Sequence, residues 1–142
     1  MRERSREILI VEDNPDEALL AKRALARIEL PLTVRIATDG EDAIAQLEAA
    51  THLPDLVLLD LKLPRLSGFE VLEWIRNAGG LRVPVVIFSN SSEARDVQMA
   101  YDLGANSFLR KPVSFDDLVE LFRNLTNYWL VWNESPPAKV TS

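Results

Sequence analysis

Five short apolar runs alternate along the chain with longer segments of helical periodicity. Most of the runs are rich in Val, Ile and Leu, and they occupy residues 7–11, 32–37, 55–59, 83–88 and 106–109. Strands that are buried on both faces of a parallel sheet have this pattern. Between the runs, apolar residues recur every three or four positions, as at Ala18, Ala21 and Leu25. A strand followed by a helix, five times over, predicts a parallel sheet with helices on both faces.

Helix boundaries are marked by capping residues, proline and glycine. We expect helices to start at Asn14-Pro15, at Asp39 or Gly40, at Ser67, and at Ser91 or Ser92. Gly79-Gly80 and Gly104 stand where helices are expected to end. In this architecture ligands bind outside the carboxyl ends of the strands, so the residues that follow the five runs are the first candidates for a site.

Composition limits the classes of protein that the chain can belong to. Its 142 residues, of which 47% are hydrophobic, suit one packed domain, expected over residues 1–133, with a flexible tail over residues 134–142. The absence of cysteine excludes disulfides and thiolate metal sites. A net charge of -6 argues against a general nucleic-acid binder. With no long apolar run and no signal peptide, we expect a cytoplasmic protein that does not bind membranes.

Polar residues with complementary chemistry follow four of the five runs. Glu12 and Asp13 follow the first run, Asp60 the third, Ser89 the fourth and Lys111 the fifth. Two carboxylates about 4 Å apart repel each other by about 4 kcal/mol at an effective dielectric constant of about 20. A cluster of three therefore needs a cation or raised pKa values, and oxygen ligands without His or Cys favour Mg²⁺ or Ca²⁺.

The same residues suit phosphoryl transfer to a carboxylate. Mg²⁺ commonly shares phosphate oxygens, Lys111 is able to pair with another phosphoryl oxygen, and Ser89 is able to donate to a third. Asp60 is then the nucleophile. Taken singly, each residue has a more ordinary explanation, such as Asp13 as a helix cap or Lys111 as a surface charge. The set of five at equivalent strand ends is what predicts a site.

Four segments and a closing amphipathic helix resemble the receiver domains of two-component response regulators. The segments are EDNPDEA, LVLLDLKLPRLSGFEVL, VVIFSNSS and GANSFLRKP, and the resemblance covers about residues 7–130. It implies a five-stranded, doubly wound, flavodoxin-like fold with strand order 2-1-3-4-5. It also implies that a sensor histidine kinase phosphorylates Asp60. Glu12, Asp13 and the backbone carbonyl of Lys62 match the positions that hold Mg²⁺.

The resemblance further implies a conformational switch. Ser89 matches the switch hydroxyl, Phe108 the switch aromatic residue and Lys111 the phosphate-pairing lysine, while the Lys111–Pro112 bond matches one that is often cis. Phosphorylation is then expected to draw Ser89 toward Asp60, to let Phe108 rotate, and to alter the surface of the fourth helix, fifth strand and fifth helix. Lys62 and Asn90 flank the site, where they either tune the phosphoryl lifetime or are ordinary loop residues.

The end of the last helix is apolar or aromatic at every position. Its NYWL ending, with the DLKLPRLSGFEVL and SNSS segments, is similar to small response regulators that partner bacterial and cyanobacterial phytochromes. This similarity implies a phytochrome-type kinase and a homodimer. The residues expected at the dimer interface are Tyr128, Trp129, Leu130 and Trp132. The alternative is that this segment packs on its own domain. An apolar strip for kinase docking is expected on the first helix, from Pro15, Leu19, Leu20 and Ala24.

Three other functions fit these residues less well. A magnesium-dependent phosphatase with an aspartyl nucleophile needs a second carboxylate two residues after Asp60, where Lys62 stands. A flavin or nucleotide site needs a phosphate loop after the first strand, where Glu12 and Asp13 place negative charge. The full set of site residues argues against a degenerate receiver. With no effector domain after the last helix, we expect output through binding, or onward transfer as a phosphorelay intermediate.

Overall fold

The five expected strands form one parallel sheet in the computed structural model, which describes residues 5–137. The strands are β1 (Arg6–Val11), β2 (Leu32–Ala37), β3 (Leu56–Leu59), β4 (Val85–Ser89) and β5 (Ser107–Arg110). Their order in the sheet is β2-β1-β3-β4-β5, and every neighbouring pair is parallel. The predicted order is therefore confirmed. Strand β4 begins two residues later than expected, after Pro84, which has no N–H for the ladder.

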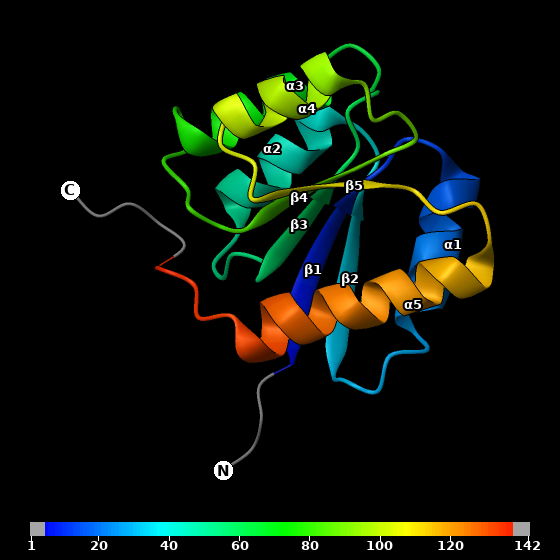
Figure 1. Ribbon diagram of the computed structural model, residues 1–142. Helices are drawn as coiled ribbons and strands as arrows, with labels where there is room; N and C mark the ends of the chain where they lie inside the picture. Colours follow the sequence, from blue (N-terminus) through cyan, green and yellow to red (C-terminus); the bar gives the residue numbers. More distant parts are fainter. Residues whose placement is uncertain (1–4, 138–142) are drawn as a thin grey trace.

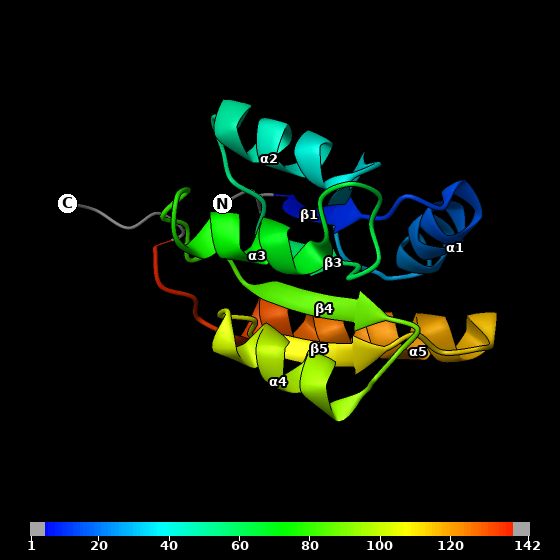
Figure 2. The same ribbon diagram turned by 90° about the horizontal axis from the view of Figure 1, so that it is seen from above.

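Five helices cover the two faces of this sheet. They are α1 (Pro15–Leu25), α2 (Gly40–Ala49), α3 (Gly68–Arg76), α4 (Ala94–Asp102) and α5 (Phe115–Thr126). Helices α1 and α5 pack on one face, whereas α2, α3 and α4 pack on the other (Figure 1). Seen from above, β1, β3, β4 and β5 follow one another across the molecule (Figure 2). Side chains of each central strand alternate between the two cores, as Ile8 and Leu9 do.

Most helices begin where the capping residues predicted. Asn14 accepts hydrogen bonds from the N–H groups of Asp16 and Glu17, and Ser67 forms a capping box with Glu70. The prediction for α4 was wrong, because its N-cap is Glu93 rather than Ser91 or Ser92. The Ser91 N–H donates to Ser89 Oγ at 3.2 Å, which turns the chain back on the strand end and delays the helix.

The aromatic segment continues α5 as a π-helical turn, η1 (Asn127–Trp132). Leu130 is only 5% exposed and lies in the core between the sheet and helices α1 and α5, against which Trp129 also packs. The prediction that Leu130 lies at a dimer interface was therefore wrong. Tyr128 and Trp132 are exposed, Trp132 by 74%. The segment thus anchors itself to its own domain and still presents aromatic side chains to solvent.

Two further expectations concern the C-terminal tail and the Lys111–Pro112 peptide bond. Residues 134–137 form neither helix nor strand and are exposed, and the rest of the expected tail, residues 138–142, lies outside the described residues. No cis peptide bond occurs between residues 5 and 137, so the Lys111–Pro112 bond is trans and the implied cis bond was wrong. Within the same range, no helix has both the length and the apolar character needed to cross a membrane.

Candidate functional site

The predicted site residues meet at the carboxyl edge of the sheet. Val11 and Leu59 are register partners in β1 and β3, so the residues that follow them, Glu12 and Asp60, lie side by side. Hydrogen bonds extend the ladder past the strand ends, from Asp60 N to Val11 O at 3.2 Å and from Lys111 N to Ser89 O at 2.7 Å. The pairing of the strands therefore determines the backbone positions of these site residues.

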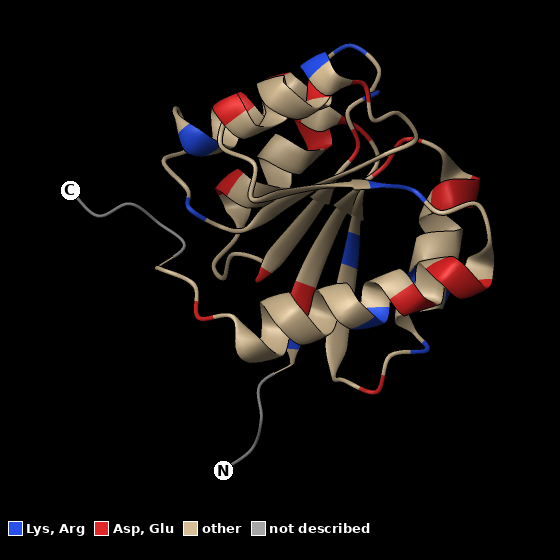
Figure 3. Cartoon of the chain, viewed as in Figure 1, with Lys and Arg blue, Asp and Glu red and all other residues tan. Residues whose placement is uncertain are grey.

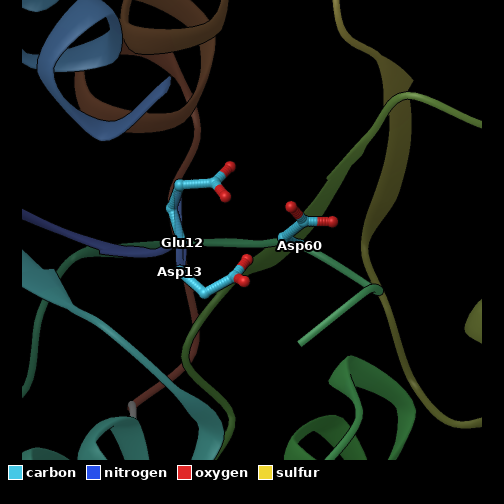
Figure 4. Close-up of side chains that lie close together, drawn as sticks. All are labelled: Glu12, Asp13 and Asp60. Carbon is cyan, nitrogen blue, oxygen red and sulfur yellow. The ribbon is translucent and has the colours of Figure 1, made fainter. Parts of the chain in front are cut away.

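Three carboxylates converge at this edge. Oxygens of Glu12, Asp13 and Asp60 all lie within 4.8 Å of one another (Figure 4). Glu12 and Asp60 are buried, whereas Asp13 is exposed and leaves the cluster open to solvent. Hard oxygen donors with one open side suit a divalent cation that keeps part of its water shell. The cluster has the chemistry of a divalent-metal site.

Lys111 reaches into the cluster from the end of β5. Its ammonium group donates to Glu12 Oε1 at 2.6 Å, to Asp60 Oδ2 at 3.0 Å and to Glu17 Oε1 at 2.8 Å. The lysine side chain is only 8% exposed. An ammonium group has three hydrogens to donate, so all three are engaged. Sequence reasoning missed Glu17, because its contact with Lys111 joins the first turn of α1 to the end of β5 and depends on how α1 packs.

Burial and pairing shift the titration of this group of side chains. Burial raises the pKa of Glu12 to about 7, although hydrogen bonds from Lys111 and from the Asn14 N–H act in the opposite direction. Burial lowers the pKa of Lys111, but its hydrogen bonds to Glu12 and Glu17, together with the negative charges of Asp60 and Glu12, outweigh burial and raise that pKa. Lys111 is therefore a permanent positive charge beside Asp60.

Both oxygens of Asp60 are held in place. Oδ1 accepts the Lys62 N–H at 3.1 Å, while Oδ2 accepts from Lys111. The start of α3 packs directly behind this residue, because a Cβ added to Gly68 would lie 2.2 Å from the Asp60 carbonyl oxygen. The carboxylate is thus oriented before any ligand arrives. Lys62 touches the site through its N–H, and its carbonyl as a metal ligand stays a prediction.

The two expected switch residues lie on β4 and β5, the strands that follow β3 in the sheet. Ser89 is buried at the end of β4, where its hydroxyl accepts from the Ser91 N–H. Phe108 is half-buried on β5, opposite Ile87, and packs on the core beneath α2, α3 and α4. Asn90 is exposed beside Ser89. This arrangement is compatible with the expected switch, which stays a prediction.

The apolar strip expected on α1 is smaller than predicted. Pro15, Leu19 and Leu20 are exposed, but Ala24 is fully buried in the core with α5 and was assigned to the strip wrongly. Ala24 lies four residues after Leu20 along α1, but at that position the helix packs against α5 and the side chain is covered. The exposed part of the strip is therefore limited to the first half of the helix.

Comparison with known proteins agrees with the geometry. The response regulator receiver domain family matches residues 8–123. "Probable methanogenesis regulatory protein FilR2" of Methanothrix harundinacea is 40% identical, over 91% of this chain and 86% of its own. The phosphorylated cyanobacterial phytochrome response regulator RcpA has a similar structure, with a TM-score of 0.86 and 34% identity over 94% of this chain and 99% of its own.

A third relative carries a metal. Response regulator Rcp1 of Synechocystis is 33% identical over 87% of this chain and 88% of its own. Its Mn²⁺-bound form has a TM-score of 0.81 with 32% identity, over 92% of this chain and 99% of its own. From its fold, its strand-end residues and these relatives, the chain belongs to the response regulator receiver domain family.

Proposed function

We propose that Asp60 accepts a phosphoryl group from a sensor histidine kinase in a Mg²⁺-dependent reaction. Receiver domains accept phosphate on an aspartate from a kinase. The observation that supports Asp60 most strongly is its position: it is buried, 3.0 Å from the Lys111 ammonium, and beside Glu12 and Asp13. No other aspartate that the structure describes joins both a carboxylate cluster and a buried cation.

The reaction needs little from the protein beyond position and charge. One oxygen of Asp60 bonds to phosphorus as the bond from phosphorus to the kinase histidine nitrogen breaks, and that nitrogen keeps the electron pair. Lys111 stabilises the negative charge on the phosphoryl oxygens. Glu12 and Asp13, with Asp60 and the Lys62 carbonyl, would hold Mg²⁺, which supplies further positive charge to the same oxygens.

The signal is a change of binding surface. The phosphoryl group adds negative charge and acceptor oxygens beside Ser89, whose hydroxyl then donates to them. That movement frees space for Phe108 to rotate and alters the face formed by α4, β5 and α5. Met99 and Tyr101 are exposed on α4, so this face already presents apolar side chains to a partner.

A phytochrome-type kinase is the proposed phosphodonor. RcpA, a phytochrome response regulator by its name, aligns over nearly the full length of both chains, and this supports the pairing. Leu19 and Leu20 on α1 give the kinase an exposed apolar contact beside the site. A homodimer through Tyr128, Trp129 and Trp132 is also proposed, because Tyr128 and Trp132 present aromatic area at the chain surface.

Phosphorylation by acetyl phosphate tests the site without a kinase. The wild-type protein is expected to gain one phosphoryl group when Mg²⁺ is present and none when the metal is chelated. Asp60→Asn should abolish the modification. Asp102→Asn is the matched control, because Asp102 is an exposed aspartate whose side chain accepts from Gln98 on α4. Stoichiometric modification of Asp60→Asn would show that the acceptor is another residue.

A further inference from the structure

Glu17 is a fourth carboxylate at the site, outside the cluster that suits a metal. It lies in the first turn of α1, where Asn14 Oδ1 caps its N–H at 3.2 Å. Its Oε1 atom accepts from Lys111 at 2.8 Å, and the side chain is 35% exposed. Figure 3 shows the acidic first turn of α1 beside the basic end of β5. Lys111 is thus shared between the sheet edge and a helix.

Glu17 and a phosphoryl group require the same ammonium group. The three hydrogens of Lys111 are divided among Glu12, Asp60 and Glu17. A phosphoryl group on Asp60 adds oxygens that also need an N–H, together with about one further negative charge. Glu12 and Asp60 are buried at strand ends and have little freedom to withdraw. Glu17 is the partly exposed partner, so it is the one that competes.

The charges at the site indicate how Glu17 changes the attraction of Lys111 for a phosphoryl group. When ionised, Glu12, Asp13, Asp60 and Glu17 carry four negative charges, whereas Lys111 and one divalent cation carry three positive charges. Without Glu17, the three remaining carboxylates balance the three positive charges, so the site is neutral before the phosphodonor arrives. The phosphodonor is itself an anion. Glu17 therefore weakens the attraction of Lys111 for the incoming phosphoryl group.

We propose that Glu17 tunes phosphoryl transfer by holding Lys111 and lowering the rate at which Asp60 is phosphorylated. Glu17 acts through Lys111 and touches no reacting atom, so it is a positioning residue. This inference rests on the proposed function of Asp60. It assigns to α1 a part in phosphoryl transfer in addition to the proposed kinase contact of Leu19 and Leu20.

The test compares variants by their rate of phosphorylation with acetyl phosphate and Mg²⁺. Glu17→Gln keeps the shape and a hydrogen-bond acceptor but removes the charge, and we expect its rate to rise about three- to tenfold. Asp16→Asn is the control, because Asp16 is an exposed acid in the same turn and the change alters net charge and the helix dipole equally. Glu17→Asp, which keeps the charge, should stay within about twofold of wild type.

Ionic strength provides a readout that a purely structural role would not change. Because Glu17 is partly exposed, added salt should screen its charge and narrow the difference between Glu17→Gln and wild type. A rate for Glu17→Gln that equals that of Asp16→Asn, or falls below wild type, would overturn the inference. A wild-type protein that takes up no phosphate would instead refute the proposed function of Asp60.

Discussion

The ammonium nitrogen of Lys111 lies 2.6 Å from a carboxylate oxygen of Glu12, and both side chains are more than nine-tenths buried. Residue 111 follows the edge strand β5 and residue 12 follows β1, with β3 and β4 between these strands. Lys111 must therefore cross the carboxyl edge of the sheet above β4 and β3, which brings its ammonium group over Asp60. This ion pair therefore connects the end of β5 to the end of β1.

Removing Lys111 should destabilise the fold as well as stop phosphorylation. Lys111→Met leaves Glu12 and Asp60 buried without their cation, and breaking a buried ion pair in this way costs about 3–5 kcal/mol. Urea unfolding in the presence of a chelator should show this loss. Because a divalent cation neutralises the same carboxylates, Mg²⁺ should recover part of it. Equal stability of both proteins under chelation would contradict the ion-pair account.

Metal affinity should depend on pH through Glu12. Burial raises the pKa of Glu12 to about 7, so at lower pH the carboxyl group is protonated and a metal has to displace that proton. Mg²⁺ affinity should therefore rise between about pH 6 and about pH 8, as calorimetric titration would show. Glu12→Gln should bind Mg²⁺ more weakly and lose this pH dependence. An affinity that is flat across this range in the wild type would contradict a metal ligand with a raised pKa at Glu12.

Gly68 should tolerate no side chain. A Cβ at this position would lie 2.2 Å from the Asp60 carbonyl oxygen and 2.7 Å from the Leu61 Cα atom, and both belong to the backbone. Gly68→Ala should cost about 1–3 kcal/mol and slow phosphorylation by displacing Asp60. Gly80→Ala is the control: nothing lies within 4 Å of its added Cβ, and only its positive φ of 61° carries a cost. A phosphorylation rate of Gly68→Ala equal to that of Gly80→Ala would contradict this role.

Substitutions in the aromatic segment should have two different effects, one on dimer formation and one on stability. Trp132→Glu changes an exposed side chain, so it should convert a dimer into a monomer in light scattering with little change in melting temperature. Leu130→Ala opens a cavity in the core and should cost about 2–5 kcal/mol of unfolding free energy. An unchanged dimer for Trp132→Glu would show that the exposed aromatic residues serve another purpose.

The alternation of strand and helix determined most of the fold. Buried runs of Val, Ile and Leu identified the strands, and the local hydrogen bonds of Asn14 and Ser67 identified two helix starts. The start of α4 was wrong because a backbone N–H at Ser91 bonds to Ser89, a turn contact that has no periodicity to reveal it. Ala24 shows the same limit, since the packing of α1 against α5 decides which apolar residues of α1 are buried.

The sequence predicted the site residues that directly follow strands. It did not predict the contacts that a helix makes with a distant strand end. Glu12, Asp60 and Lys111 meet because the sheet order places their strand ends together. The pairing of Glu17 with Lys111 depends on the direction of α1, which no local pattern gives. Outside the site, the contacts of Arg76 show the same limit: its guanidinium donates to the Gly104 and Val83 carbonyls, which only the fold brings close to it.

The residue that carries the phosphoryl group decides whether Asp60 is the phosphoacceptor. After phosphorylation with acetyl phosphate and Mg²⁺, peptide mapping by mass spectrometry should place the phosphoryl group on Asp60 and on no other residue. The account predicts that this modification disappears when Mg²⁺ is chelated and in Lys111→Met. A phosphoryl group mapped to Asp13 or to any residue other than Asp60 would contradict it.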